Sequence, residues 1–305
     1  MPEASQNRAV HRLAVLTAST TVLLLVAGAL VTSNDAADSV PDWPLAYGRI
    51  IPPLIGGIRY EFAHRVIAGL VAILTVILAI AISRASLRKA AFHAGWLAVA
   101  LVFAQALLGG IRVVFHHPAL VATAHATLAQ IFFLTVVGLA LFTSPWWQSD
   151  HPPLEDSASP RLASLTSWTT LVILVQLVLG AGFRHGAFGI LPHLIGAAAV
   201  TFMVVWTGRT AKSRFRSIPE IRRSVVWLHA TFGTQILLGF AAYWAVAASR
   251  QSSQPMLLYV LITVAHVVVG ALTLASSVLL TLLCHHLIGP AASAAVNSSA
   301  ESARA

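Results

Sequence analysis

The sequence predicts an all-α membrane protein whose eight transmembrane helices form two pseudo-symmetric four-helix bundles. Three observations support this prediction. Of the 305 residues, 57% are hydrophobic and only 10% are charged, whereas a soluble domain carries about 25% charged residues. The apolar residues form runs long enough to cross a membrane. Landmark residues of the first half return at similar separations in the second half.

Eight apolar runs approach the length of about 20 residues that a helix needs to cross the hydrocarbon core. The first run follows Arg8 and Arg12. It exceeds the apolar region of about 7–15 residues in a secretory signal, so we expect a retained helix. The runs are 13–32, 62–83, 94–115, 119–143, 164–183, 190–208, 225–247 and 257–283.

The charged loops predict the orientation of these helices. Cations gather before the first helix, in loop 84–89 and in loop 209–223. The positive-inside rule therefore places these segments and both termini in the cytoplasm. The net charge of +9 reflects these topology signals, and we expect no binding to nucleic acid. Residues 291–305 are rich in Ala and Ser and are expected to form a disordered tail.

The two halves share a repeated pattern. Gln-x-x-Leu-Gly begins at Gln105, Gln176 and Gln235. We therefore expect an N-terminal bundle over 1–150 and a C-terminal bundle over 151–290. The alternative is chance recurrence, because small residues are common in membrane helices. Only the first half has a long outer loop, over residues 33–60. Long loops are often functional, although an ordinary surface loop is the competing interpretation.

Four histidines occur near the outer start of the even-numbered helices, so they share one layer of the membrane. Imidazole is a common ligand of heme iron, and four-helix bundles build such sites from facing helices. The pattern predicts two heme centres toward the outer side, one in each half. The alternative is four hydrogen-bonded core histidines. The four residues are His64, His125, His193 and His266.

Glu61 is the candidate catalytic residue of the first half. It lies three residues before His64 and therefore on the same helix face, and an ionisable residue within a membrane span suggests function. The corresponding residue of the second half is Ile190. The alternative is an acid favoured by the dipole at a helix N-terminus. Arg65 is expected to neutralise either Glu61 or a heme propionate.

The roles of several other cations stay open. Arg184 is expected either to bind a heme propionate through its guanidinium or to reach the membrane interface. His185 follows it at the outer end of the same helix. His93 and His229 lie at the cytoplasmic level and are expected to be structural. The outer loop histidines 116–117 are expected to be polar loop residues, and the pair 285–286 is expected to be solvated.

These motifs resemble the heme A synthase family along nearly the whole chain. The most specific match is Pro41-Asp42-Trp43-Pro44-Leu45 followed by Glu61-x-x-His64-Arg65. The resemblance implies an eight-helix enzyme of the bacterial cytoplasmic membrane that is built from two four-helix halves. It would oxidise a ring methyl of heme o to a formyl group, through a hydroxylated intermediate, and so supply heme A to terminal oxidases.

The resemblance also implies roles for particular residues and partners. His64 and His125 would flank the substrate heme, with Glu61 as the catalytic carboxylate, while His193 and His266 would bind heme b. Heme o synthase, an electron carrier and the lipid bilayer would be partners, and a homo-oligomer stays open. The first outer loop lacks the paired cysteines of many relatives, because Cys284 is the only cysteine.

Two other functions compete with this one. A di-heme electron-transfer cytochrome b would need the four histidines but not Glu61. A transporter built from repeats would need a polar pathway at mid-membrane, and the helix centres here carry almost no charge. In a further departure from many relatives, Leu194 stands where they have arginine after the third histidine.

Overall fold

The structure, a computed structural model, describes residues 2–37, 39–115, 118–249, 252 and 255–289. These residues form nine helices, of which eight are long and apolar enough to cross a membrane. Within the same ranges the only β pairing is two isolated bridges. The predicted all-α membrane class is therefore confirmed. The expected tail, 291–305, and the histidines 116–117 lie outside the described residues.

Every predicted apolar run corresponds to one long helix, and the short helix α5 is additional. The helices extend past several runs because a hydropathy pattern marks only the apolar core, whereas backbone hydrogen bonding continues into the polar interface. α8, for example, begins at Pro219, a residue favoured in the first helical turn. The bounds are α1 Pro2–Ser33, α2 Ile58–Ser83, α3 Lys89–Val114, α4 Ala119–Phe142, α5 Pro145–Gln148, α6 Leu162–Arg184, α7 Ile190–Arg214, α8 Pro219–Ser249 and α9 Leu257–Leu287.

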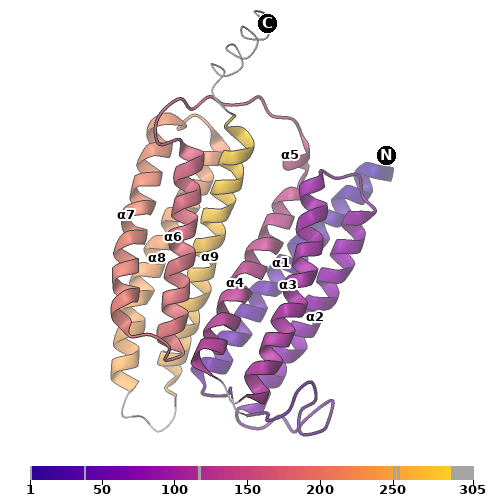
Figure 1. Cartoon of the computed structure of the whole chain (residues 1–305), viewed down its shortest axis with the longest axis vertical. Helices are drawn as coiled ribbons and strands as arrows, with labels where there is room; N and C mark the ends of the chain where they lie inside the picture. The colour runs from indigo at the N-terminus through magenta and orange to yellow at the C-terminus, as the bar shows by residue number, and fades with distance from the viewer. Residues whose placement is uncertain (1, 38, 116–117, 250–251, 253–254, 290–305) are drawn as a thin grey trace, which may run out of the picture.

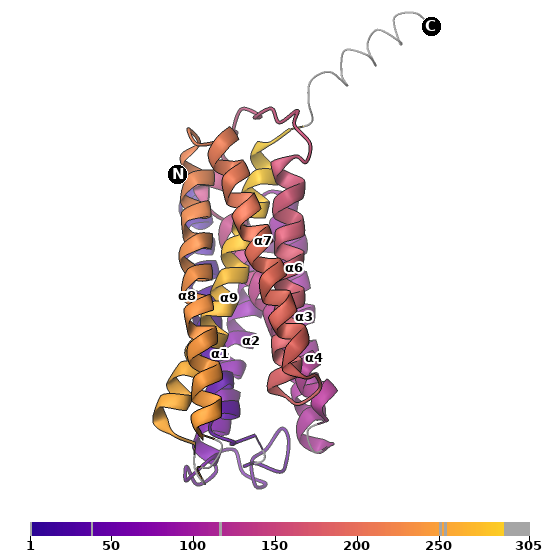
Figure 2. The same ribbon diagram turned by 90° about the vertical axis from the view of Figure 1, so that its left-hand side faces the viewer.

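The long helices stand side by side in two groups, α1–α4 and α6–α9 (Figure 1). Helix α9 joins the groups, since it packs against α1 and α4 of the first and against α6 and α8 of the second. The N-terminus lies at the same end of the molecule as α5 (Figure 1). The long loop between α1 and α2 lies at the opposite end (Figure 2). The starts of α2, α4, α7 and α9, which carry the four histidines, therefore lie at the end of the molecule that holds this loop.

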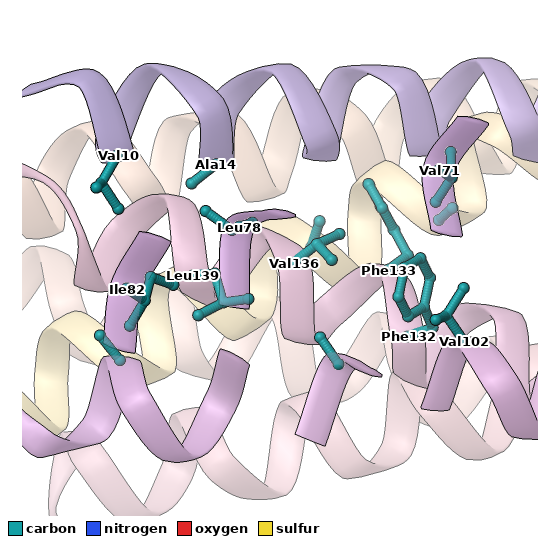
Figure 3. Packing of buried hydrophobic residues seen from close by; sticks show 14 residues of the cluster. Val10, Ala14, Val71, Leu78, Ile82, Val102, Phe132, Phe133, Val136 and Leu139 are labelled. Carbon is teal, nitrogen blue, oxygen red and sulfur yellow. The ribbon is translucent and has the colours of Figure 1, made fainter. Parts of the chain in front are cut away.

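The core of the first group is made of apolar side chains that meet between its helices (Figure 3). Leu78 of α2 and both Val136 and Leu139 of α4 are completely buried. Between membrane helices the stabilisation comes from van der Waals packing rather than from exclusion of water. This tight packing fixes the spacing of the helices that carry the candidate site.

The end of the molecule that holds α5 contains a group of stacked aromatic and imidazole rings. The His286 ring lies 4.0 Å from the ring of Trp147 at an interplanar angle of 22°. His286 is therefore half-buried: one face of its ring stacks on Trp147 of α5, and the residue stays partly exposed. His285 is exposed as expected and bonds through Nε2 with the Ser167 hydroxyl at 2.8 Å.

Candidate functional site

Each of the four candidate histidines packs its ring against a glycine of the preceding long helix. A Cβ atom built on Gly180 of α6 would lie only 2.8 Å from Cε1 of His193 on α7. Real Cβ atoms do not approach so closely, so glycine is what lets the imidazole reach the neighbouring backbone. The other pairs repeat this arrangement at 3.1 Å for Gly28 and His64, 3.2 Å for Gly109 and His125, and 3.4 Å for Gly239 and His266.

A glutamine lies one turn before three of these glycines and bonds to the same histidine. Nε2 of Gln105 donates to the backbone carbonyl of His125 at 3.0 Å and lies 3.2 Å from its ring Nε2. The repeated Gln-x-x-Leu-Gly motif thus provides a glycine against which the histidine ring packs, here called its glycine seat, and a side-chain amide that bonds to the same histidine. The remaining contacts join Gln176 Nε2 to the His193 carbonyl at 2.9 Å and Gln235 Nε2 to His266 Nε2 at 3.5 Å.

Helix α1 departs from this pattern. Leu24 occupies the position one turn before Gly28, where the other three helices carry glutamine. The His64 ring lies close to the Leu24 backbone. His64 therefore has a glycine seat but no side-chain amide from the motif.

The histidines form two pairs, as the sequence predicts for two metal centres. The His193 and His266 rings lie 6.4 Å apart at 87°, and His64 is close enough to His125 to interact with it electrostatically. In all four residues Nδ1 is buried and has no hydrogen-bond partner among the described residues. An imidazole nitrogen binds a metal at about 2 Å. The spacing of the second pair therefore fits iron held between two histidines.

A heme site of this type differs from a metal site made by protein side chains alone. The described part of the chain contains no group of three or more His, Cys, Asp or Glu side chains placed to hold a metal ion. Heme iron takes most of its ligands from the porphyrin and needs at most two from the protein. Paired histidines are thus the arrangement expected for heme.

Glu61 is buried, with 5% of its surface exposed, and both of its oxygens are hydrogen-bonded. Oε1 accepts a 2.7 Å bond from Nη2 of Arg65, and Oε2 accepts a 3.0 Å bond from the backbone N–H of Val40. Nη1 of the same arginine donates to the carbonyls of Asp42 and Leu45, both at 2.9 Å. Of the two partners expected for Arg65, the structure shows Glu61.

The loop between α1 and α2 packs against α2 and α3 beside the first histidine pair. A Cβ atom on Gly110 of α3 would lie 2.7 Å from Cδ2 of Trp43, so the indole sits directly on the helix beside the Gly109 seat. The carboxylate of Asp42 accepts the backbone N–H groups of Tyr47 at 2.6 Å and Gly48 at 2.8 Å. The Gly48 bond in particular lowers the pKa of Asp42 below its ordinary value.

Arg112 is a member of this site that the sequence analysis did not single out. It interacts electrostatically with Glu61, His64 and His125. Its position three residues after Gly109 places it on the same face of α3 as that glycine. The spacing was therefore visible in the sequence, but the residue could be taken for an ordinary cation at a helix end.

Arg184, the last residue of α6, lies between the two groups of helices. Its Nη2 donates to Ser33 Oγ at 2.7 Å and to the Ala29 carbonyl at 3.2 Å, both on α1. Ser33 Oγ also bonds Thr263 Oγ1 of α9 at 2.8 Å. Three helices therefore meet at this arginine.

The fold defines a multi-pass integral membrane protein with four glycine-seated histidines toward one end. No protein-family model matches the chain. It is similar to the heme A synthase of Bacillus licheniformis, with 26% identity covering 81% of this chain and 77% of the relative. The enzyme named heme A synthase in Symbiobacterium thermophilum is 28% identical, over 74% of this chain and 83% of its own length.

A third relative, the heme A synthase of Shouchella clausii, is 30% identical over 59% of this chain, and the match covers 60% of the relative's length. These bacterial relatives confirm the resemblance of this chain to the heme A synthase family. The alignments extend over most of the membrane region and so are not limited to one motif.

Proposed function

We propose that this protein is a heme A synthase, which oxidises a ring methyl of heme o to a formyl group through a hydroxylated intermediate. The heme A would serve terminal oxidases. The observation that carries the proposal is the buried carboxylate of Glu61, one helical turn from His64 and paired with Arg65. A cytochrome that only transfers electrons needs no such acid, and the second half has Ile190 in its place.

The two halves receive different hemes in this proposal. His64 and His125 hold the substrate heme o, and His193 and His266 hold a resident heme b. Bound heme iron supplies the redox chemistry. The propionates carry negative charge. Arg112 and Arg65 interact electrostatically with His64, and Arg184 with His266. Guanidinium groups match carboxylates well, which makes these three arginines the candidate propionate ligands.

Glu61 supplies the acid–base chemistry. With water as the oxygen source, conversion of a methyl to a formyl group releases electrons and protons in equal number. An electron carrier of the membrane accepts the electrons, and the Glu61 carboxylate accepts protons at its oxygens. Burial excludes bulk water from the acceptor, while Arg65 and the Val40 N–H hold it in place. Such general base catalysis contributes about 10²–10⁴-fold to a rate.

The test is heme extraction and mass analysis after coexpression with heme o synthase. The matched control for Glu61→Ala is Glu155→Ala, an exposed acid in the loop between the halves. We expect heme A or its hydroxylated intermediate in the wild type and the control, and a decrease of about 100-fold in Glu61→Ala. Heme b alone in the wild type, from cells that contain heme o, would refute the proposal and favour a di-heme cytochrome.

We also propose that the termini lie in the cytoplasm and the heme sites toward the outer side. Support comes from the cationic loops at the end of the molecule opposite the histidines. In a Cys284→Ala background, Ile55→Cys should react with a membrane-impermeant maleimide in intact cells. Ser217→Cys, between α7 and α8, should react only after permeabilisation. The reverse pattern would overturn the orientation.

A further inference from the structure

The four histidine sites are alike in their glycines and differ in one side chain. Three of them have a glutamine amide at the ring or at the histidine's own carbonyl, and His64 has Leu24. The backbone does not make this difference. The rings of His193 and His266 also lie close to the backbone of Gln176 and Gln235, just as the His64 ring lies close to that of Leu24. What α1 lacks is therefore the amide alone.

Each of these amides has hydrogen-bonding capacity that the structure leaves unused. Oε1 of all three glutamines is buried and has no partner among the residues that the structure describes. Nδ1 of the neighbouring histidine is unsatisfied in the same way. A buried polar atom without a partner is costly, so both atoms are expected to find partners in the loaded protein. The three glutamines involved are Gln105, Gln176 and Gln235.

A metal-bound histidine normally donates its second ring N–H to an acceptor, which fixes the ring and makes it a stronger ligand. The glutamine oxygen is an acceptor of this kind, and its Nε2 is already anchored on the partner helix in two sites. Leucine has no acceptor. The second half thus has two supported histidines, whereas the first half has one.

We propose that the three glutamines are positioning residues for the heme ligands, and that Leu24 makes His64 the ligand from which heme is released. This inference rests on the proposed function, because a substrate heme has to leave after each reaction while a resident heme stays. The difference in glutamine support therefore assigns heme exchange to the first half and heme retention to the second.

The experiment measures heme transfer from the full-length protein, loaded with heme b in detergent, to excess apomyoglobin. A His193→Ala/His266→Ala background reports the first half, and a His64→Ala/His125→Ala background reports the second. We expect the first half to release heme faster. Leu24→Gln should slow its release about 10-fold, in line with the effect of such supporting partners on metal affinity. Leu23→Gln, at a 60% exposed neighbour, is the control and should change nothing.

The second half tests the same idea in the opposite direction and does not depend on folding of Leu24→Gln. Gln176→Leu should release heme about 10-fold faster and raise the midpoint potential of that heme, since a weaker ligand stabilises ferric iron less. Gln176→Glu keeps an acceptor, and so should restore retention and lower the potential. A purely structural role of Gln176 would not reverse the potential between Leu and Glu.

Equal release from both halves, or Gln176 variants with unchanged release and potential, would overturn the inference. These readouts use heme b and require no heme A. If heme A is never formed but the release rates follow the pattern, the proposed function fails and the positioning role of the glutamines stands. If heme A is formed while the rates ignore the glutamines, the inference fails alone.

Discussion

Nη2 of Arg65 lies 2.7 Å from Oε1 of Glu61, one turn earlier on α2, while Nη1 of the same guanidinium bonds two carbonyls of the outer loop. One arginine therefore holds both the candidate catalytic carboxylate and the loop above it. Glu61 adds a second link, since its other oxygen accepts the N–H of Val40. The position of the acid and the order of the loop are coupled.

Arg65→Lys should loosen the outer loop. Lysine retains the charge but cannot repeat the planar fork that reaches a carboxylate and two carbonyls together. Losing one hydrogen bond to a charged group costs about 1.5 kcal/mol, which corresponds to about a tenfold change in an equilibrium. We expect protease added on the outer side to cut residues 48–56 about ten times faster. Arg59→Lys is the control, because its guanidinium bonds the Tyr60 hydroxyl and lies over the same ring. Equal cleavage of both variants would contradict the prediction.

The pKa of Asp42 predicts how the same loop responds to acid. The Gly48 N–H, followed by that of Tyr47, lowers this pKa below the ordinary 3.8 in the folded protein. A lowered folded pKa adds stability above the unfolded value, and this stability is lost as the pH falls through the folded value. Amide exchange at Tyr47 and Gly48 should stay protected from neutral pH down to about 4 and lose protection below it. Protection that is lost near pH 6 would indicate a different titrating group.

Much of the fold could be predicted because membrane helices must satisfy their own backbone hydrogen bonds, which leaves long apolar runs in the sequence. The direction of the helices alone was enough to predict that the four histidines share one level of the membrane. Helix α5 could not be predicted, since four residues capped by Ser144 carry no periodicity. The stacking of His286 on Trp147 joins residues far apart in the chain, so the sequence around either residue could not predict this contact.

The candidate site was predictable in its residues but not in its contacts. Gln-x-x-Leu-Gly was recognised as a repeat, yet its meaning depends on which helix faces which. Only the structure shows that Gly109 seats His125 and that Gln105 bonds the same residue. The partner of Arg65 was left open between Glu61 and a propionate, because both lie within reach of an arginine. The assignment of chemistry to one half and heme b to the other stays a prediction.

Replacing these glycines by alanine should reduce heme binding to different degrees, depending on how close the new Cβ atom would lie to the histidine ring. Gly180→Ala would place Cβ 2.8 Å from the His193 ring, whereas Gly239→Ala would place it 3.4 Å from the His266 ring. The first ring must move and the second can stay. We expect Gly180→Ala to lose most of the heme b of the second half and Gly239→Ala to keep it, as judged from heme content per protein. Gly69→Ala, which has no atom within 4 Å of its Cβ, should retain heme and gain up to about 1 kcal/mol of helix stability.

Arg184 provides the last prediction, because it connects the two halves through Ser33 and Ala29 of α1. Arg184→Leu removes a charged donor and leaves Ser33 with Thr263 alone, at a cost of about 1.5–3 kcal/mol. Ser33→Ala should cost less, and the double variant should lose less stability than the sum of the two single variants, since both changes remove the Arg184–Ser33 bond. Thermal unfolding in detergent measures the stability, and additive losses would show that Ser33 is not the relevant partner. Heme b content separates the two roles of the arginine: a structural connection predicts similar heme content in both single variants. A propionate ligand predicts heme loss in Arg184→Leu alone, because Ser33→Ala leaves the guanidinium in place.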